Sequence, residues 1–393
     1  MHISHINIIF VLTYSVLSMR EIQMVDLQKQ YSDIRSEIDH AIQNVINSSA
    51  FIKGPEVTEF EKELQDYLSV KHVISCANGT DALQIAMMTL GLRPGDEVIT
   101  TDFTFISTVE VVALLGLNIV LVDPDPETFN ISAEAVRKVV TPRTKAIIPV
   151  HLFGQCSDME SINKIAEEYN LYVIEDAAQS TGADYIFSDG KRQKSGTIGN
   201  IGTTSFFPSK NLGCYGDGGA LYTNNEEYAA KARSIANHGM KIKYHHDHVG
   251  INSRLDTIQA AILRVKLKYL DKYNEARKNA ADYYDKAFSE CPYISVPFRV
   301  PYSTHIFHQY TLRIKNGRRD ELRKYLSEKK IPSMVYYPVP LHIQNAYRYL
   351  GYSETDFPVT NALCKEVLSL PMHPDIVREQ LEYITNNVLK FFE

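Results

Sequence analysis

The sequence predicts an α/β protein with a large domain, in which a mixed, mostly parallel sheet lies between helices, and a smaller α+β domain after it. Between about residues 34 and 300, segments with helical periodicity alternate with short β-rich runs that end in turn residues. This alternation is the pattern of βα units. The β-rich runs are almost entirely apolar, which is typical of strands covered by helices on both faces.

Local patterns predict the individual elements. Strands are predicted at 73–75, 97–99, 119–122, 146–150 and 172–174, with helices at 81–90 and 158–169. Another helix should begin at Leu255, because Ser253 and Asp256 have capping-box spacing ahead of residues with helical periodicity. Further on, we expect a strand at 310–314 and a helix at 319–329. The chain then divides into an N-terminal extension (1–23), a large domain (24–269) and a small domain (270–393).

Composition narrows the classes of protein. The chain has 393 residues, 44% hydrophobic and 22% charged, with a net charge of −6, as expected for a folded globular protein. Its one short basic run, at 191–194, is predicted to be a solvated loop, so nucleic acid is not an expected partner. The five cysteines are scattered and never spaced as C-x-x-C, which argues against disulfides and a zinc cluster and favours reduced thiols in a cytoplasm.

The N-terminal extension contains an apolar stretch at 6–17. No Lys or Arg precedes it, and it is too short to span a bilayer. No other run of about eighteen apolar residues occurs, so we expect a cytoplasmic protein that does not enter a membrane.

Lys210 is the first candidate for chemistry. It ends the largely apolar run 205–210 and precedes a glycine-dense loop at 211–219. Desolvation lowers the pKa of a lysine and makes it a better amine nucleophile. Because a single lysine is more often a solvated charge, the interpretation depends on its neighbours in the fold.

Three other features should meet at the carboxyl ends of the strands, where open α/β sheets bind ligands. Asp176 follows a predicted strand, with Gln179 three residues later, although Asp176 could instead cap a helix. The turn at 78–81 joins a strand to a helix, so its free amides and the helix dipole favour an anion. Phe105 also follows a strand, and its ring could cover a planar ligand or pack in the core.

These features together fit pyridoxal 5′-phosphate. Its aldehyde can react with Lys210, its ring nitrogen can pair with Asp176, and its phosphate suits Gly79, Thr80 and Ser205. The sequence has no Walker loop and no G-x-G-x-x-G after a strand, which disfavours nucleotide hydrolysis and nicotinamide chemistry.

Several segments resemble the DegT-type nucleotide-sugar aminotransferases, of the pyridoxal-phosphate fold type I (aspartate aminotransferase-like). They are Val173–Gln179, Ser205–Lys210, Gly216–Ala220, Asn252–Asp256 and Ser369–Pro374, and the resemblance runs from about Val25 to the C-terminus. It implies that Lys210 forms a Schiff base and shuttles protons. The other cofactor-binding residues that it implies are Gly79, Thr80, Asp81, Phe105, Asp176, Gln179, Ser205 and Asn252. Asn252 would reach the cofactor of a neighbouring subunit, so the resemblance implies a homodimer with shared active sites.

The resemblance also implies the substrates. L-Glutamate would become 2-oxoglutarate, and its amino group would pass to a nucleotide-linked keto-sugar. Residues 206–217 and 244–246 look most like enzymes acting on UDP-2-acetamido-2-deoxy-3-oxo-glucuronate, in lipopolysaccharide (O-antigen) biosynthesis. Arg254 could bind the sugar carboxylate bidentately, or it could be a solvated residue of a helix's first turn.

Other parts of the sequence leave alternatives. His245 and His246 are predicted sugar contacts, and a metal site among these histidines is disfavoured. Tyr336 is a further predicted contact, although Tyr336-Tyr337-Pro338 departs from the His-Tyr-Pro expected in the uronate enzymes. The segment 252–256 also resembles relatives that act on dTDP-3-keto-6-deoxyhexoses. A non-catalytic regulatory protein on the same scaffold is a second class, which retention of Lys210 and Asp176 disfavours.

Overall fold

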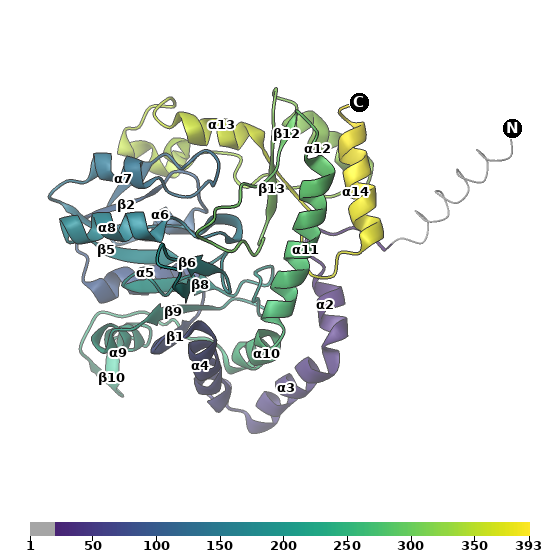
Figure 1. Ribbon diagram of the computed structural model, residues 1–393. Coiled ribbons are helices and arrows are strands. Elements are labelled where there is room, and N and C mark those ends of the chain that lie inside the picture. The colour runs from purple at the N-terminus through teal and green to yellow at the C-terminus, as the bar shows by residue number, and fades with distance from the viewer. Residues whose placement is uncertain (1–19) are drawn as a thin grey trace, which may run out of the picture.

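The computed structural model describes residues 20–393, and the predictions for the stretch at 6–17 lie outside them. A seven-stranded sheet with its helices forms one part of the molecule, and α11, α12 and α14 stand together beside it (Figure 1). The described residues contain no helix long and apolar enough to cross a membrane.

The central sheet has the order β1-β9-β8-β5-β4-β2-β3. Its strands are His72–Cys76 (β1), Glu97–Thr101 (β2), Asn118–Val122 (β3), Thr144–Ile148 (β4), Tyr172–Asp176 (β5), Ile201–Ser205 (β8) and Gly219–Thr223 (β9). β9 alone runs in the direction opposite to the other six strands of this sheet. The prediction of an α/β fold with a mixed, mostly parallel sheet is therefore confirmed.

Helices cover both faces of the sheet, which explains the apolar strands. Consecutive strand residues point to opposite faces. Ile174 and Ile148 join the core beneath α5 (Gly79–Leu90), α6 (Ser107–Leu114) and α9 (Glu226–Ile235). Val173 and Ile147 join the core with α7 (Ala133–Val139) and α8 (Met159–Tyr169) on the other face. Each such buried side chain contributes about 1.5–3 kcal/mol relative to exposure.

The helices α2 (Leu27–Asp33), α3 (Arg35–Ser48), α4 (Pro55–Leu68) and α10 (Thr257–Leu267) form the lower edge in Figure 1, where α10 packs on α3 and α4. The predicted start of α10 at Leu255 with a Ser253 cap is wrong. Ser253 is buried and its hydroxyl accepts the Ala77 amide at 3.0 Å. The Thr257 amide instead donates to the Phe51 carbonyl at 3.0 Å, so a distant segment satisfies the start of the helix.

The C-terminal part has its own core. It contains α11 (Leu270–Phe288), α12 (Arg319–Glu328), α13 (Pro358–Glu366) and α14 (Arg378–Lys390), with an antiparallel sheet of β12 (Ile294–Ser295), β13 (Tyr310–Ile314) and β14 (Val367–Leu370). Tyr284, Tyr310 and Leu326 are fully buried there. Although α11 begins at Leu270, a division into domains at that residue stays a prediction, since Leu341 and Phe357 pack into the core of the central sheet.

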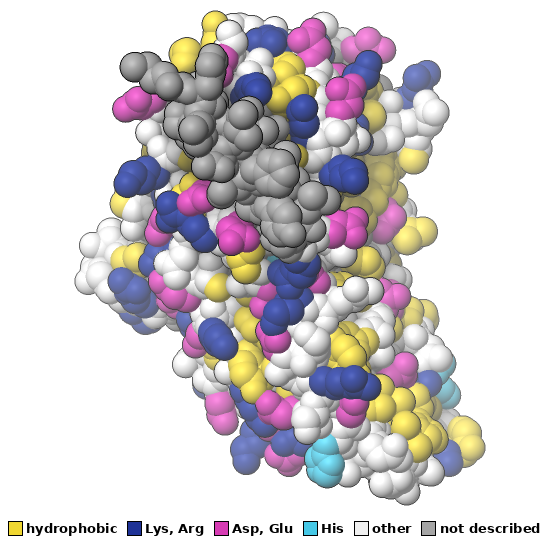
Figure 2. Space-filling model, turned by 90° about the vertical axis from the view of Figure 1, so that its right-hand side faces the viewer, with side chains coloured by type: hydrophobic (Ala, Val, Ile, Leu, Met, Phe, Trp, Pro, Cys, Tyr) yellow, Lys and Arg dark blue, Asp and Glu magenta, His cyan; other side chains and the backbone are white. Residues whose placement is uncertain are grey.

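Short hairpins and 3-10 turns complete the fold. The hairpins are β6 (Asp184–Ile186) with β7 (Arg192–Lys194), and β10 (Met240–Ile242) with β11 (His245–His246), and the 3-10 turns are η1 (Leu152–Gly154), η2 (Leu341–Ile343) and η3 (Asn345–Leu350). The solvated loop predicted at 191–194 is thus largely a strand, because β7 pairs with β6 and Lys194 bonds Asp184 at 2.9 Å. Positive and negative side chains are interspersed on the face in Figure 2. All five cysteines are free.

Candidate active site

A cavity of about 790 Å³ gathers most of the predicted cofactor-binding residues. Turns after β1, β2, β5 and β8 supply them, as expected for the carboxyl ends of parallel strands. The predicted residues that line it are Gly79, Thr80, Asp81, Phe105, Asp176, Gln179, Ser205, Lys210 and Tyr336. These residues, from five separate segments, are therefore brought together.

Lys210 lies in the turn that follows β8. Its amide donates to the Phe207 carbonyl at 2.8 Å. Phe206, four residues earlier in the same run, is fully buried. Burial lowers the pKa of the Lys210 amine to about 8, and Asp176 acts in the opposite direction. At pH 7 roughly a tenth of the amine is consequently uncharged, far more than for an ordinary lysine, and the uncharged form is the one that attacks a carbonyl carbon.

Asp176 ends β5 and is 7% exposed. Its carboxylate accepts hydrogen bonds from the Thr108 hydroxyl at 3.0 Å and the Ala178 amide at 3.2 Å. Burial is the main influence on the pKa of this carboxyl and raises it. A turn follows Asp176 instead of a helix, so the helix-cap interpretation is wrong. A buried carboxylate with so few donors favours a cationic ligand beside it.

A buried hydrogen-bond network behind Asp176 was not predicted. His151 and Glu175 are both fully buried, with His151 Nε2 at 2.9 Å from Glu175 Oε2. His151 Nδ1 accepts the Ser157 amide at 3.1 Å, so the ring proton is on Nε2. Glu175 also accepts the amides of Gly196, Ile198 and Gly199 at 2.5–3.0 Å. The His151 amide in turn bonds the Asp176 carbonyl at 3.0 Å, which fixes the end of β5.

The start of α5 provides a cradle for an anion. Asn78 caps the helix by accepting the Asp81 amide at 2.8 Å, and the amides of the first turn have no partner within the helix. A Cβ added to Gly79 would lie 2.7 Å from the Ser205 Cβ, so glycine permits a close approach of the two segments. The Ser205 hydroxyl is thereby placed beside the helix N-terminus, a favourable position for phosphate.

Aromatic side chains line another wall of the cavity. Phe105 is 54% exposed, which rules out the alternative of a core ring. Its ring centroid lies 6.2 Å from that of Tyr337. Gln179 accepts the Phe153 amide at 2.8 Å and donates to the Tyr337 hydroxyl at 3.2 Å, which leaves its second amide hydrogen for a ligand.

Sequence reasoning missed Tyr337, His308 and Gln309, which all line the cavity. Tyr337 directly follows the predicted Tyr336 and matches the tyrosine of the expected His-Tyr-Pro, which was a usable signal. His308 carries no such signal. Its pKa is lowered well below the usual value by burial, with Lys210 and Arg277 adding to the effect.

Four predicted residues do not line this cavity. Asn252 is exposed and forms a β-bridge with Asn237, and Arg254 donates to the Asn237 side chain at 3.3 Å. His245 and His246 are exposed on β11. Within residues 20–393, no cluster of three or more His, Cys, Asp or Glu side chains could hold a metal ion.

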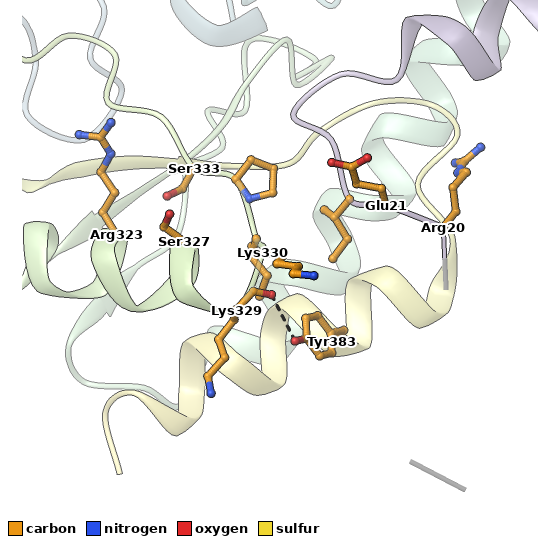
Figure 3. Close-up of a pocket in the computed structure, with 11 residues that line it drawn as sticks. Arg20, Glu21, Arg323, Ser327, Lys329, Lys330, Ser333 and Tyr383 are labelled. Atoms are coloured by element: carbon orange, nitrogen blue, oxygen red, sulfur yellow. Dashed lines mark hydrogen bonds between the residues drawn. The ribbon is translucent and has the colours of Figure 1, made fainter. Parts of the chain in front are cut away.

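A second cavity, of about 920 Å³, lies between α12, α14 and the start of the described chain (Figure 3). Arg20, Arg323, Lys329 and Lys330 are among its residues, and the Tyr383 hydroxyl donates to the Lys329 carbonyl at 3.2 Å. It contains no predicted cofactor-binding residue. The cavity with Lys210 is therefore the candidate active site.

Comparison with known proteins identifies the class. Residues 32–389 match the DegT/DnrJ/EryC1/StrS aminotransferase family. The chain belongs to this family, whose aminotransferases depend on pyridoxal phosphate, so the predicted reaction class and cofactor are confirmed.

Individual relatives cover nearly the whole chain. A pleiotropic regulatory protein of Geobacillus stearothermophilus is 47% identical over 94% of this chain and 98% of its own. The UDP-2-acetamido-2-deoxy-3-oxo-D-glucuronate aminotransferase of Pseudomonas aeruginosa is 47% identical over 90% of this chain and 95% of its own. The structure of DesV from S. venezuelae in complex with a ketimine intermediate is 37% identical, covers 95% of this chain and 99% of its own, and superposes with a TM-score of 0.92.

Proposed function

We propose that this protein moves the amino group of L-glutamate to UDP-2-acetamido-2-deoxy-3-oxo-glucuronate, in the cytoplasm, for O-antigen or related lipopolysaccharide biosynthesis. The convergence of Lys210, Asp176 and the Gly79–Ser205 cradle in one cavity carries the proposal. The 47% identical aminotransferase of P. aeruginosa supports this choice of sugar.

The residues fit pyridoxal phosphate, which supplies an electron sink when it is bound. The first turn of α5 and Ser205 would hold its phosphate, and Phe105 would lie over its ring. Asp176 would pair with the ring nitrogen and favour its protonated form. Gln179 would donate its free amide hydrogen to the phenolic oxygen.

Lys210 would accept the proton from the α-carbon of glutamate in the first half-reaction and would deliver a proton to the sugar carbon that receives the amino group in the second. A pKa of about 8 lets the amine both accept and release a proton near neutral pH. The partly enclosed cavity limits the access of water to this amine, which favours transfer of the amino group over hydrolysis.

Arg254 would bind the sugar carboxylate from a neighbouring subunit, in a homodimer with shared active sites. Asn252 would reach the neighbouring cofactor phosphate from the same surface, with His245 and His246 at the sugar. None of the four lines the cavity of its own chain, which supports a need for a second copy. Lys53 and Arg233 are cationic neighbours of Arg254, since burial and then these two arginines lower the pKa of Lys53, while Glu61 opposes them and pairs with Arg233 at 2.7 Å. Such a surface suits an anionic substrate.

A dTDP-3-keto-6-deoxyhexose is the alternative substrate. A dTDP-3-amino-3,4,6-trideoxy-alpha-D-glucose transaminase of Streptomyces venezuelae is 38% identical over 95% of this chain and 96% of its own. A regulatory role is a separate candidate, favoured by the name of the Geobacillus relative. It gives no reason for Lys210 and Asp176 to share a cavity.

One experiment separates these candidates. The cofactor-loaded protein is incubated with glutamate and either keto-sugar, and the amino-sugar is detected by mass. Loss of the visible cofactor absorbance on adding glutamate, followed by product from the UDP-sugar, is the expected result. Turnover of the dTDP-sugar alone would refute the choice of sugar. If the cofactor absorbance does not respond to glutamate, the proposed aminotransferase activity is refuted.

The substrate role of Arg254 has a separate test. Arg254→Ala should raise the KM for the uronate by about tenfold or more, the cost of a lost charge-assisted hydrogen bond. The glutamate half-reaction should be nearly unchanged, because it needs no sugar carboxylate. Equal losses in both halves would contradict the role, and Lys164→Met, at an exposed site on α8, serves as the control.

A further inference from the structure

Two buried residues outside the cavity join the two chain segments that supply its aromatic wall. Asp102 directly follows β2 and precedes Phe105 by three residues. His342 lies in η2, a few residues after Tyr336 and Tyr337. The side chains of Asp102 and His342 are both 0% exposed, and neither residue lines the cavity.

Asp102 binds His342 through both carboxylate oxygens. Oδ1 accepts the His342 backbone amide at 2.8 Å, and Oδ2 lies 2.6 Å from His342 Nδ1. A carboxylate only accepts hydrogen bonds, so the ring proton is on Nδ1. His342 Nε2 is buried without a hydrogen-bond partner, and protonating it would leave a donor unsatisfied. The geometry therefore has one favoured arrangement, a neutral imidazole that donates to an ionised Asp102.

The two segments that this contact joins also carry the aromatic side chains of the cavity wall. The centroid of the Tyr337 ring lies 6.0 Å from that of Phe103 and 6.2 Å from that of Phe105. Its hydroxyl accepts the Gln179 side-chain amide. The His342 ring packs on Phe357 at 4.8 Å, which fixes its far side. A shift of His342 would be transmitted along the short segment to Tyr337.

We propose that Asp102 and His342 form a clasp that positions Tyr337 against Phe105 and Gln179, and thereby sets the affinity of the cavity for the keto-sugar. The second part rests on the proposed function. Both are positioning residues, because they act through Tyr337 and do not contact the ligand. The strength of the clasp comes from burial, since removing one partner leaves the other polar group unsatisfied.

Asp102→Ala and His342→Ala test the clasp directly. Each should raise the KM for the keto-sugar by about tenfold, with the rate of the glutamate half-reaction within about threefold of wild type. The double variant should be no worse than either single variant, because both remove one interaction. His342→Asn retains a side-chain N–H near the position of Nδ1, so its KM for the keto-sugar should be much closer to wild type than that of His342→Ala.

A matched control separates positioning from loss of stability. Thr360 is fully buried, and its hydroxyl donates to Asp123 at 2.9 Å in another contact between distant segments. Thr360→Val should lower the thermal midpoint without raising the KM. If Thr360→Val raises the KM as much as the clasp variants do, or if folded clasp variants keep the wild-type KM, the proposal is overturned.

A readout without sugar distinguishes failure of the clasp from failure of the proposed function. The visible absorbance of the bound cofactor is titrated with pH in Asp102→Ala and Tyr337→Phe. The clasp predicts that both variants shift the midpoint in the same direction and that the double variant shifts it no further. A wild-type midpoint in Asp102→Ala alongside a shifted one in Tyr337→Phe overturns the clasp, whatever sugar the protein uses.

Discussion

Replacing Lys210 with methionine should stabilise the cofactor-free protein near neutral pH. The pKa of this amine falls from the usual 10.5 to about 8 in the folded chain. That shift corresponds to about 3 kcal/mol of cost to the folded state when the amine is charged. Because part of the side chain faces the cavity, where water screens the charge, the expected gain is about 1–3 kcal/mol.

The pH dependence isolates the effect of charge. Between pH 8 and 10.5 the unfolded chain holds the proton and the folded chain has released it, so the stability of the wild type rises with pH. The advantage of Lys210→Met should be largest below pH 8 and disappear above 10.5. Urea unfolding at pH 7 and pH 10 measures it, with Lys164→Met as the control. An advantage of equal size at both pH values would refute the reasoning.

Three further predictions concern the site. Asp176→Asn should slow the glutamate half-reaction by about a hundredfold or more, because a neutral amide cannot stabilise a protonated ring nitrogen, and stopped-flow absorbance measures it. Gly79→Ala should weaken cofactor binding by about tenfold, since the new Cβ meets Ser205 at 2.7 Å, and a titration of cofactor absorbance measures it. Glu175→Gln should lower stability by about 3 kcal/mol in urea unfolding, because three backbone amides and His151 lose their charged acceptor; an unchanged midpoint would contradict the assigned network.

Local sequence patterns predicted five of the seven strands of the central sheet, β1 to β5. The apolar strand at 172–174 leads into Asp176, so the place of Asp176 at the carboxyl ends of the strands follows from general rules of parallel sheets. The strand before Lys210, Ile201–Ser205, consists mainly of Gly, Thr and Ser and was not predicted. The tight turn at Gly79 was also visible, since it joins a strand to a helix. These features depend on residues that are near one another in sequence or share a strand end.

The features that were missed depend on distant pairs. Asp102 and His342 are 240 positions apart, and nothing in either neighbourhood indicates the other. Ser253 fitted a helix cap, but its hydroxyl is used by Ala77, 176 positions away. The same tertiary contacts moved the start of α10 to Thr257. Secondary-structure propensity describes one segment by itself, whereas the hydrogen-bond partners of these residues lie in other segments.

The place of β9 in the sheet determines when the anion cradle at the start of α5 can form. β9 pairs with β1 in the register His72 to Thr223 and lies between β1 and β8. A Cβ at Gly219 would meet the Asn78 backbone at 2.4 Å, so β9 also packs against the turn that leads into α5. A nascent chain that has not yet emerged beyond Thr223 therefore lacks the strand that holds the cradle together. Cofactor capture by ribosome-bound chains of increasing length would report the moment at which this sheet closes during synthesis.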